Sequence, residues 1–339
     1  EGQFGGGVAD TVPEGHQIKG VSSLYNASGG ISAQWIKTSQ NAQEMEEARE
    51  VALKALAEKL PAENLPKLDR PAHEKDLLNL YILTDFHLGM KAWGEETRGP
   101  DWDIDIAEQV LVDWFAAAIA ASPPAHTAIL GQLGDFLHWD GLDAVTPTAH
   151  NVLDADTRFQ KVVRVAIRAM RRIIMMLRAK HPHTHIIVAE GNHDPAASIW
   201  MREFLSSIYR ECTEINVDRS ADPYYCYEWG DTSLFFHHGH KRKPNNIDDV
   251  FVAKFREEFG RTKFSYAHMG HMHSVHTIES NLMIVEQHRT LASRDAYASR
   301  GGWISGGDAS CITYHKDHGQ VGRVTIRPEM LNNEDPRKV

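Results

Sequence analysis

The sequence predicts a mixed α/β fold (α+β), in which a sandwich of two β-sheets is flanked by helices. Two observations support this prediction. Between residues 78 and 189, short apolar runs alternate with long amphipathic stretches, an order typical of parallel strands joined by helical crossovers. Beyond residue 223, short strand-like runs follow one another with turns between them. They predict a second, mostly antiparallel sheet packed on the first.

The helices and strands of this core follow from periodicity. Apolar residues at helical spacing predict helices over 103–121, 155–180 and 248–259. The predicted first-sheet strands end near Leu83, Leu133 and Ala189. The predicted second-sheet strands cover 224–229, 233–236, 265–267, 283–285, 311–314 and 322–326.

An N-terminal appendage precedes this core. Residues 1–14 are rich in glycine and predict a flexible lead-in. Residues 17–38 contain two arms around Asn26-Ala-Ser-Gly-Gly, which predicts a β-hairpin. Apolar residues three or four apart over 41–60 predict an amphipathic helix. Nothing in this part carries recognisable chemistry, so we expect a docking segment.

Prolines mark the boundary between the appendage and the core. A linker is indicated by Pro61, Pro66 and Pro71. We therefore assign residues 1–75 to the appendage, 76–330 to the main domain and 331–339 to a tail. The first residue is not Met, which suggests that residues upstream are missing.

Composition limits the class of protein. The chain has 339 residues, of which 42% are hydrophobic and 24% charged, as in ordinary globular proteins. A formal net charge of −10 argues against a generic nucleic-acid coat protein. Three widely spaced cysteines without a Cys-x-x-Cys pattern indicate a reducing, cytoplasmic compartment. Neither a signal peptide nor a membrane-spanning apolar run is present, so no membrane partner is expected.

Several predicted strands end in Asp, Asn or His. Asp85 and His87 follow the first strand and project from the same face of an extended backbone. Later runs end in Gly134-Asp135, Gly191-Asn192-His193-Asp194, His237-His238-Gly239-His240 and Gly270-His271-Met272-His273. Clusters of Asp, Asn and His along one sheet edge usually hold a metal, which predicts a metal site there.

These five motifs, in this order, resemble those of the calcineurin-like metallophosphoesterase superfamily over residues 78–328. The resemblance implies the family's four-layer fold and a phosphoester hydrolase with two divalent ions. It implies one ion held by Asp85, His87, Asp135 and His273, and the other by Asp135, Asn192, His238 and His271. Asp135 would bridge the two ions. The family favours manganese, and the mixed ligands also suit iron or zinc.

The resemblance also assigns catalytic roles. His193 corresponds to the family's histidine that protonates the leaving oxygen, and we expect Asp194 to orient its ring. In the segment His237-His238-Gly239-His240, the family's ligand directly precedes glycine, which selects His238. Histidines that match no motif are expected at the surface: His181, His183, His185, His315 and His318.

Two details resemble the double-strand-break repair nucleases, including the nuclease subunit of the bacterial SbcCD complex. They are Asp85-Phe-His-Leu-Gly and Gly134-Asp135-Phe-Leu-His138. The resemblance implies that His138 helps to place the DNA strand at the metals. Cations expected to hold flanking phosphates are Lys91, Lys241, Arg242 and Lys243. Loop tryptophans expected to border the site or to pack in the core are Trp93, Trp102 and Trp139.

The leading hypothesis is therefore a two-metal phosphodiesterase that acts on DNA as an exonuclease or endonuclease. One alternative is a phosphodiesterase of cyclic nucleotides or other small molecules, and another is a metal-stabilised binding module. Because the chain ends soon after residue 328, an ATPase partner like that of the repair nucleases is not expected. The sequence leaves a homodimer open.

Overall fold

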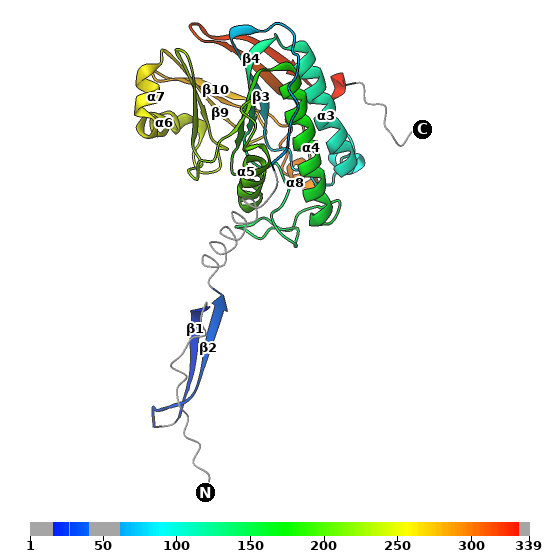
Figure 1. Cartoon of the computed structure of the whole chain (residues 1–339). Coiled ribbons are helices and arrows are strands. Elements are labelled where there is room, and N and C mark those ends of the chain that lie inside the picture. Colours follow the sequence, from blue (N-terminus) through cyan, green and yellow to red (C-terminus); the bar gives the residue numbers. More distant parts are fainter. Residues whose placement is uncertain (1–15, 27, 41–61, 332–339) are drawn as a thin grey trace. The chain divides into compact units, whose positions relative to one another are not determined.

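The computed structural model describes residues 16–26, 28–40 and 62–331. The chain forms two compact units, residues 1–60 and 61–339, which are considered separately (Figure 1). The predicted lead-in, the predicted helix over 41–60 and the tail beyond Leu331 lie outside the described residues.

The first unit contains a two-stranded antiparallel hairpin, as the sequence predicts. Strand β1 covers His16–Tyr25 and β2 covers Ile31–Gln40. The side chain of Asn26 accepts a hydrogen bond from the backbone N–H of Gly30 at 2.8 Å. Gly29 has a φ of 85°, a left-handed conformation that glycine adopts without steric cost. Turn chemistry therefore accounts for the position of this reversal.

The second unit begins before the boundary that we expected. Arg70 lies in the segment assigned to the appendage, yet its guanidinium donates to both carboxylate oxygens of Glu214 at 3.0 and 2.8 Å. The backbone N–H of Glu63 donates to the carbonyl of Ile208. Residues 62–75 are thus part of the larger unit.

The first sheet has six strands. Their spatial order is β13 (Gly319–Ile326), β12 (Ala309–His315), β3 (Glu74–Leu83), β4 (Ala125–Gln132), β5 (His183–Val188) and β6 (Ile215–Val217). From β3 to β6 the strands are parallel, whereas β12 pairs antiparallel with β3 and with β13. The helices between the parallel strands are α3 (Ile104–Ala121), α4 (Phe159–Lys180) and α5 (Pro195–Tyr209).

The second sheet has five strands. Their order is β10 (His276–Glu279), β11 (Ile284–Gln287), β9 (Phe264–Met269), β8 (Thr232–Phe236) and β7 (Tyr225–Trp229). Both neighbours of β9 run parallel to it, and the two outer pairs are antiparallel. The prediction of a mostly antiparallel sheet is wrong, because α6 and α7 after β8 and strand β10 after β9 let the chain return in the same direction.

The remaining elements are short. They are α2 (Gly94–Thr97), η1 (Pro244–Asn246), α6 (Asp248–Lys254), α7 (Arg256–Arg261), α8 (Ala296–Arg300) and η2 (Pro328–Met330). The single helix expected over 248–259 is broken at Phe255, whose φ of −120° and ψ of 50° are not helical. Helix α5 was not predicted.

Strands β12 and β13 correct the predicted composition of the sheets. We expected both in the second sheet, but β12 lies beside β3 in the first. Six of its seven residues are buried, as in a strand covered on both faces. Periodicity identified the strand, but it could not show which neighbour the chain reaches after β11.

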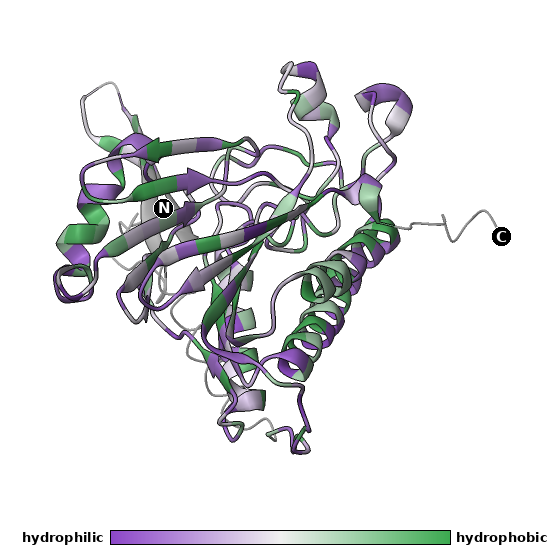
Figure 2. Ribbon diagram, turned by 90° about the horizontal axis from the view of Figure 1, so that it is seen from above, coloured by the Kyte–Doolittle hydropathy of each residue, from purple (hydrophilic) through white to green (hydrophobic). Residues whose placement is uncertain are grey.

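The core lies between the two sheets. On β3, alternate residues Leu78, Leu80 and Ile82 belong to one buried cluster with Leu234 and Phe236 of β8. This alternation is the two-residue period of a strand. Figure 2 shows hydrophobic residues along the strands of both sheets and on the long helices.

Helices cover the outer face of each sheet. On the first sheet, the ring of Tyr81 lies 6.2 Å from that of Phe115 in α3. On the second sheet, Phe235 stacks on Phe251 of α6 at 5.1 Å. The four layers are helices, sheet, sheet and helices (Figure 1), which confirms the predicted fold class.

Two histidines expected at the surface are buried. His181 is 0% exposed, and it hydrogen-bonds to the Tyr81 hydroxyl at 2.9 Å and to the Ala125 carbonyl at 2.7 Å. His185 on β5 is 7% exposed. Burial lowers the pKa of each ring to about 4, so both are neutral near pH 7. These histidines are part of the first sheet's packing.

Cysteines and helices add two findings. All three cysteines, Cys212, Cys226 and Cys311, are free thiols. Among the described helices, none combines the length and the apolar character that crossing a bilayer requires.

A polar network is buried where β9, β11, β12 and β13 meet. His268 hydrogen-bonds to His288 and to the Tyr314 hydroxyl, both at 2.9 Å. Glu286 is 6% exposed and pairs with the guanidinium of Arg323. Burial alone would raise the pKa of Glu286, but the hydrogen bonds from Arg323 outweigh it and lower the pKa to about 2.

This lowered pKa predicts a pH-dependent contribution to stability. The ionised carboxylate of Glu286 stabilises the fold above its ordinary pKa of about 4.3, and the contribution is lost as pH falls from there toward 2. We expect Glu286→Gln to lower the free energy of unfolding at pH 7 by about 2 to 3 kcal/mol. Denaturant unfolding at several pH values measures this free energy. The difference between Glu286→Gln and wild type should narrow below pH 4.

Glu228→Gln is the matched control. Glu228 pairs with Arg261 at the surface, where solvent screens the interaction. At pH 7, Glu228→Gln should therefore lower the free energy of unfolding less than Glu286→Gln does. Equal losses of unfolding free energy in the two variants would contradict this role of Glu286. So would a difference between Glu286→Gln and wild type that does not vary with pH.

Candidate metal centre

Seven polar side chains follow the carboxyl ends of strands in both sheets. Asp85 and His87 follow β3, Asp135 follows β4, Asn192 follows β5, His238 follows β8, and His271 and His273 follow β9. The carboxyl ends of parallel strands meet at one edge, where ligands bind in folds of this kind. The structure brings all seven residues together there, as the sequence analysis expected.

The first group of ligand atoms comes from Asp85, His87 and His273, which lie within 4.8 Å of one another. The Nε2 atoms of the two histidines are 3.2 Å apart. Oδ1 of Asp85 is 3.3 Å from Nε2 of His273. Asp85 is 0% exposed, so its charge is shielded from water.

The second group comes from Asp135, His238 and His271, again within 4.8 Å. Nε2 of His238 is 3.2 Å from Oδ2 of Asp135 and 3.2 Å from Oδ1 of Asn192. It is also 3.9 Å from Oδ1 of Asp85. The two groups therefore adjoin each other.

The chemistry of these atoms fits divalent cations. Nδ1 of His238 lies 2.8 Å from the carbonyl of Leu133, so the Nδ1 proton donates there. In the neutral ring, the Nε2 lone pair then faces the oxygens of Asp135 and Asn192, which are also electron-rich. Oδ1 of Asp85 is buried without a hydrogen-bond donor among the described residues. A cation between such atoms resolves their mutual repulsion.

The pKa of His238 indicates the same need for positive charge beside the carboxylates. Burial lowers the pKa of His238, but the carboxylates of Asp135 and Asp85 outweigh burial and raise the pKa to about 9. A proton on this ring therefore serves the same purpose as a positive ion beside the two carboxylates. Histidine, aspartate and asparagine together suit manganese, iron or zinc.

Five of the seven residues have a left-handed backbone. Their φ values are 50° at Asp85, 49° at His87, 51° at Asp135, 77° at His271 and 52° at His273. Side chains other than glycine rarely adopt this region, and each such residue costs on the order of 1–3 kcal/mol. Strain of this kind collects at functional sites because the surrounding fold holds the side chains in place.

Two glycines leave room for the carboxylates. A Cβ at Gly191 would lie 1.9 Å from Oδ1 of Asp135, and a Cβ at Gly270 would lie 2.4 Å from Oδ2 of Asp85. Oδ2 of Asp85 accepts hydrogen bonds from the Thr84 hydroxyl at 2.5 Å and from the His271 N–H at 2.8 Å. The glycines in these two motifs thus have a steric role.

His193 lies beside the metal centre. Its backbone N–H donates to Oδ1 of Asp135 at 2.8 Å, and its ring is 4.7 Å from the ring of His87. Nδ1 of His193 bonds to the carbonyl of His138 at 2.8 Å. This bond orients the ring and leaves Nε2 as the atom available to a substrate.

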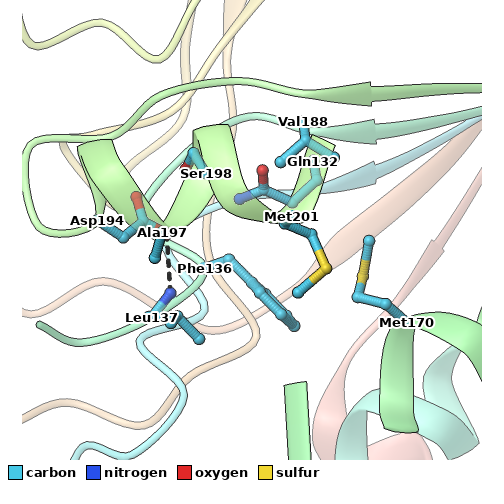
Figure 3. A pocket seen from close by; sticks show the side chains of 9 residues that line it. All are labelled: Gln132, Phe136, Leu137, Met170, Val188, Asp194, Ala197, Ser198 and Met201. Carbon is cyan, nitrogen blue, oxygen red and sulfur yellow. Dashed lines mark hydrogen bonds between the residues drawn. The ribbon is translucent and has the colours of Figure 1, made fainter. Parts of the chain in front are cut away.

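Asp194 does not orient His193, contrary to our interpretation of the sequence. Its Oδ1 accepts from the backbone N–H groups of Asp135 at 3.1 Å and Gly191 at 3.3 Å. Its Oδ2 accepts from Leu137 at 2.9 Å, beside a small cavity (Figure 3). Burial and the charge of Asp135 raise the pKa of Asp194 to about 8. Asp194 therefore positions the backbone that carries Asp135.

His138 packs against the rings of His87 and His193. It is 2% exposed, stacks on His193 at 5.7 Å, and its Nδ1 is 3.4 Å from Nδ1 of His87. Burial and the nearby His193 lower the pKa of His138 to about 3. A neutral ring in this position supports His87 and His193.

The cations and tryptophans that we expected near the site differ in their exposure and pairing. Lys241, Arg242 and Lys243 are exposed in the turn after His238, whereas Lys91 forms an ion pair with Asp156 at 3.0 Å. Trp102 and Trp139 are buried in the core, and Trp93 is 58% exposed. Of these three tryptophans, only Trp93 is exposed enough to contact a ligand.

Sequence analysis missed two residues that support the site. The hydroxyl of Thr290 donates to the backbone carbonyl of Asp85 at 2.6 Å, and that of Thr84 donates to the Asp85 carboxylate. Threonine next to Asp85 was visible in the sequence, but Thr290 lies 205 positions away. No local pattern links it to the site.

Comparisons with known proteins give only distant similarity. No family model matches the chain, and the search of curated proteins finds no match.

Several solved structures are similar. A conserved uncharacterized protein from Streptococcus pneumoniae, described as a predicted phosphoesterase, has 10% identity and a TM-score of 0.32, covering 75% of this chain and 99% of that one. An archaeal phosphodiesterase has 14% identity and a TM-score of 0.35, covering 73% and 99%. Vps29 complexed with Zn²⁺, from Entamoeba histolytica, has 11% identity and a TM-score of 0.31, covering 74% and 99%. Similarity this low supports no statement about activity, which has to be inferred from the site.

The steric role of Gly191 gives a direct test of the site. We expect Gly191→Ala to weaken divalent-metal binding at least tenfold, because the new methyl group must displace the Asp135 carboxylate. Metal titration, with bound metal per chain measured by elemental analysis, gives the affinity. Gly260→Ala is the matched control, since its added Cβ meets nothing within 4 Å. Wild-type metal affinity in Gly191→Ala would refute this arrangement of ligands.

Proposed function

We propose that this chain is a phosphodiesterase that depends on two divalent metal ions. The observation that supports the proposal best is the pair of adjoining ligand groups, which share the edge where both sheets end. Asp85 Oδ1 is 3.9 Å from Nε2 of His238, so the two groups meet at the first carboxylate. By the resemblance of its motifs, the chain would be a calcineurin-like metallophosphoesterase.

Two divalent ions, when bound, would lower the pKa of water and neutralise charge on the phosphate oxygens. The residues of the chain prepare that chemistry. Asp135 is 1% exposed and Asp85 0%, so both carboxylates act in a dry environment. Asn192 contributes a neutral oxygen next to His238, which limits the negative charge around the ions.

His193 is the proposed general acid. Its Nδ1 is engaged by the His138 carbonyl, and its backbone N–H donates to Asp135, so the ring is fixed at the edge of the ligand groups. Nε2 would donate a proton to the oxygen that leaves phosphorus. A general acid typically contributes about 10² to 10⁴ in rate.

We further propose DNA as the substrate, in the manner of the double-strand-break nucleases. Support comes from the exposure of the site: the side chain of His273 is 38% exposed, so the ligand groups border solvent. An open site accommodates a polymer, whereas a small nucleotide would be favoured by an enclosed pocket. The exposed cations Lys241, Arg242 and Lys243 follow His238 directly and would hold flanking phosphates.

The role of His193 predicts a dependence on the leaving group. We expect His193→Ala to keep wild-type metal content and to lower kcat by about 10² to 10⁴ on a dinucleotide, whose alkoxide leaving group needs a proton. On bis(p-nitrophenyl) phosphate the loss should be smaller, because p-nitrophenolate leaves without one. Steady-state rates with manganese measure both. Exposed His318→Ala is the control, and equal losses on the two substrates would remove His193 as the acid.

A cleavage panel tests the substrate. We expect single-stranded or linear duplex DNA to be cleaved with manganese, with a larger kcat/KM than cyclic nucleotides or bis(p-nitrophenyl) phosphate. Gel analysis of end-labelled substrates measures this. Hydrolysis of cyclic nucleotides alone would establish the small-molecule alternative. Failure to hydrolyse any phosphodiester under metal-loaded conditions would overturn the proposed function.

A further inference from the structure

The segment between β11 and β12, residues 288–308, joins the metal centre to an exposed rim. Near its start, Thr290 donates to the carbonyl of Asp85 at 2.6 Å. Asp295 caps α8 through the N–H of Ala298 at 2.8 Å. The segment that carries α8 is therefore tied near its start to the backbone of Asp85.

Two exposed aromatic rings lie on this anchored segment. Tyr297 is 72% exposed and Trp303 is 58% exposed, and their ring centroids are 5.2 Å apart. Neither ring is needed for the core, which is buried elsewhere. Exposed aromatic groups of this size that lie together usually mark an interaction site.

The backbone holds Trp303 in place although its ring is exposed. Its N–H donates to the Ala298 carbonyl at 3.0 Å, closing the end of α8. Gly302 has a φ of 73°, which allows the chain to reverse. A Cβ at Gly301 would lie 2.8 Å from the indole ring, so the ring packs directly over the Gly301 backbone.

A second short helix extends the rim. Helix α2 packs against α8, and Glu96 forms an ion pair with Arg300. Arg294 donates to the Thr97 carbonyl at 3.2 Å. Trp93, which precedes α2, is 58% exposed. Arg98 ends the same helix and is exposed, but the helix also carries the acidic residues Glu95 and Glu96.

We propose that Tyr297 and Trp303, with Trp93 on the adjacent helix, form a stacking platform for unpaired nucleobases of a nucleic-acid strand cut at the metal centre. This platform rests on the proposed phosphodiesterase function. Two features favour a nucleic-acid strand over a protein surface: the continuity with the proposed metal centre through Thr290 and the exposed aromatic faces. Stacking of bases on aromatic side chains strengthens the binding of a strand and tolerates any sequence.

The platform deepens the substrate assignment. Bases inside a duplex already stack on one another and cannot reach the rings, whereas single strands and frayed ends can. The chain should therefore prefer unpaired nucleotides to blunt duplex. The small bis(p-nitrophenyl) phosphate can reach the metal centre without spanning the rim.

Trp303→Ala and Gly301→Ala test the platform in the full-length, manganese-loaded protein. Trp303→Ala should lower kcat/KM for a single-stranded oligonucleotide about tenfold or more, and should lower that for bis(p-nitrophenyl) phosphate much less. Gly301→Ala retains both aromatic residues but displaces the indole, so it should act in the same direction. Gly260→Ala and Val321→Ala, at a remote glycine and a remote exposed apolar residue, are the controls.

Measurements of oligonucleotide binding test the platform independently of the proposed phosphodiesterase activity. Fluorescence anisotropy with a phosphorothioate oligonucleotide should show weaker binding in both variants, whether or not the strand is cleaved. Oligonucleotide kcat/KM and affinity within twofold of wild type in both variants would overturn the platform, as would equal losses on the oligonucleotide and the aryl ester. A rim that binds proteins instead would leave oligonucleotide affinity unchanged. Hydrolysis of no phosphodiester, with oligonucleotide binding still dependent on Trp303, would reject the activity and keep the platform.

Discussion

The rest of this structure depends on the burial of two carboxylates, Asp85 and Asp135, at the edge where the two sheets meet. An anion removed from water is costly unless hydrogen bonds and positive charge replace its hydration. The His271 and His193 N–H groups each satisfy one oxygen. The other oxygens face imidazole nitrogens, and this leaves a requirement for positive charge that cations would meet.

Strand direction makes this convergence possible. Neighbouring parallel strands end at the same edge of a sheet, whereas antiparallel neighbours end at opposite edges. Strands β8 and β9 are parallel, and Phe236 is in register with His268, so His238 and His271 follow at one edge. A mostly antiparallel second sheet, as we had expected, would have separated these two ligands. The error in topology and the convergence of these candidate ligands therefore concern the same strands.

The sequence predicted which side chains would converge, because each candidate ligand lies in a short motif at a strand end, where residue type and local structure agree. Interactions between distant segments were not predictable in this way. Asp194 looked like a partner of its neighbour His193, but its oxygens meet N–H groups at residues 135 and 137. His181 was expected at the surface because no motif includes it, yet Tyr81 and Ala125 bind it in the interior. In both cases at least two of the partners lie more than 50 residues away.

The position of each part of the site follows from the element that carries it. The candidate ligands follow strand ends, where the sheets and the strained backbone fix their geometry, so the reactivity of the proposed centre would be a property of the fold. The aromatic rim stands on α2 and α8, two helices of four and five residues joined by side-chain contacts. Loops and short helices vary more readily than sheets, and they usually decide what a shared catalytic centre acts on. Under the proposed function, substrate preference would accordingly be encoded in residues 93–98 and 288–308, and the chemistry at the strand ends. Because Thr290 connects the second of these segments to the backbone of Asp85, the two proposed functions would share one physical link.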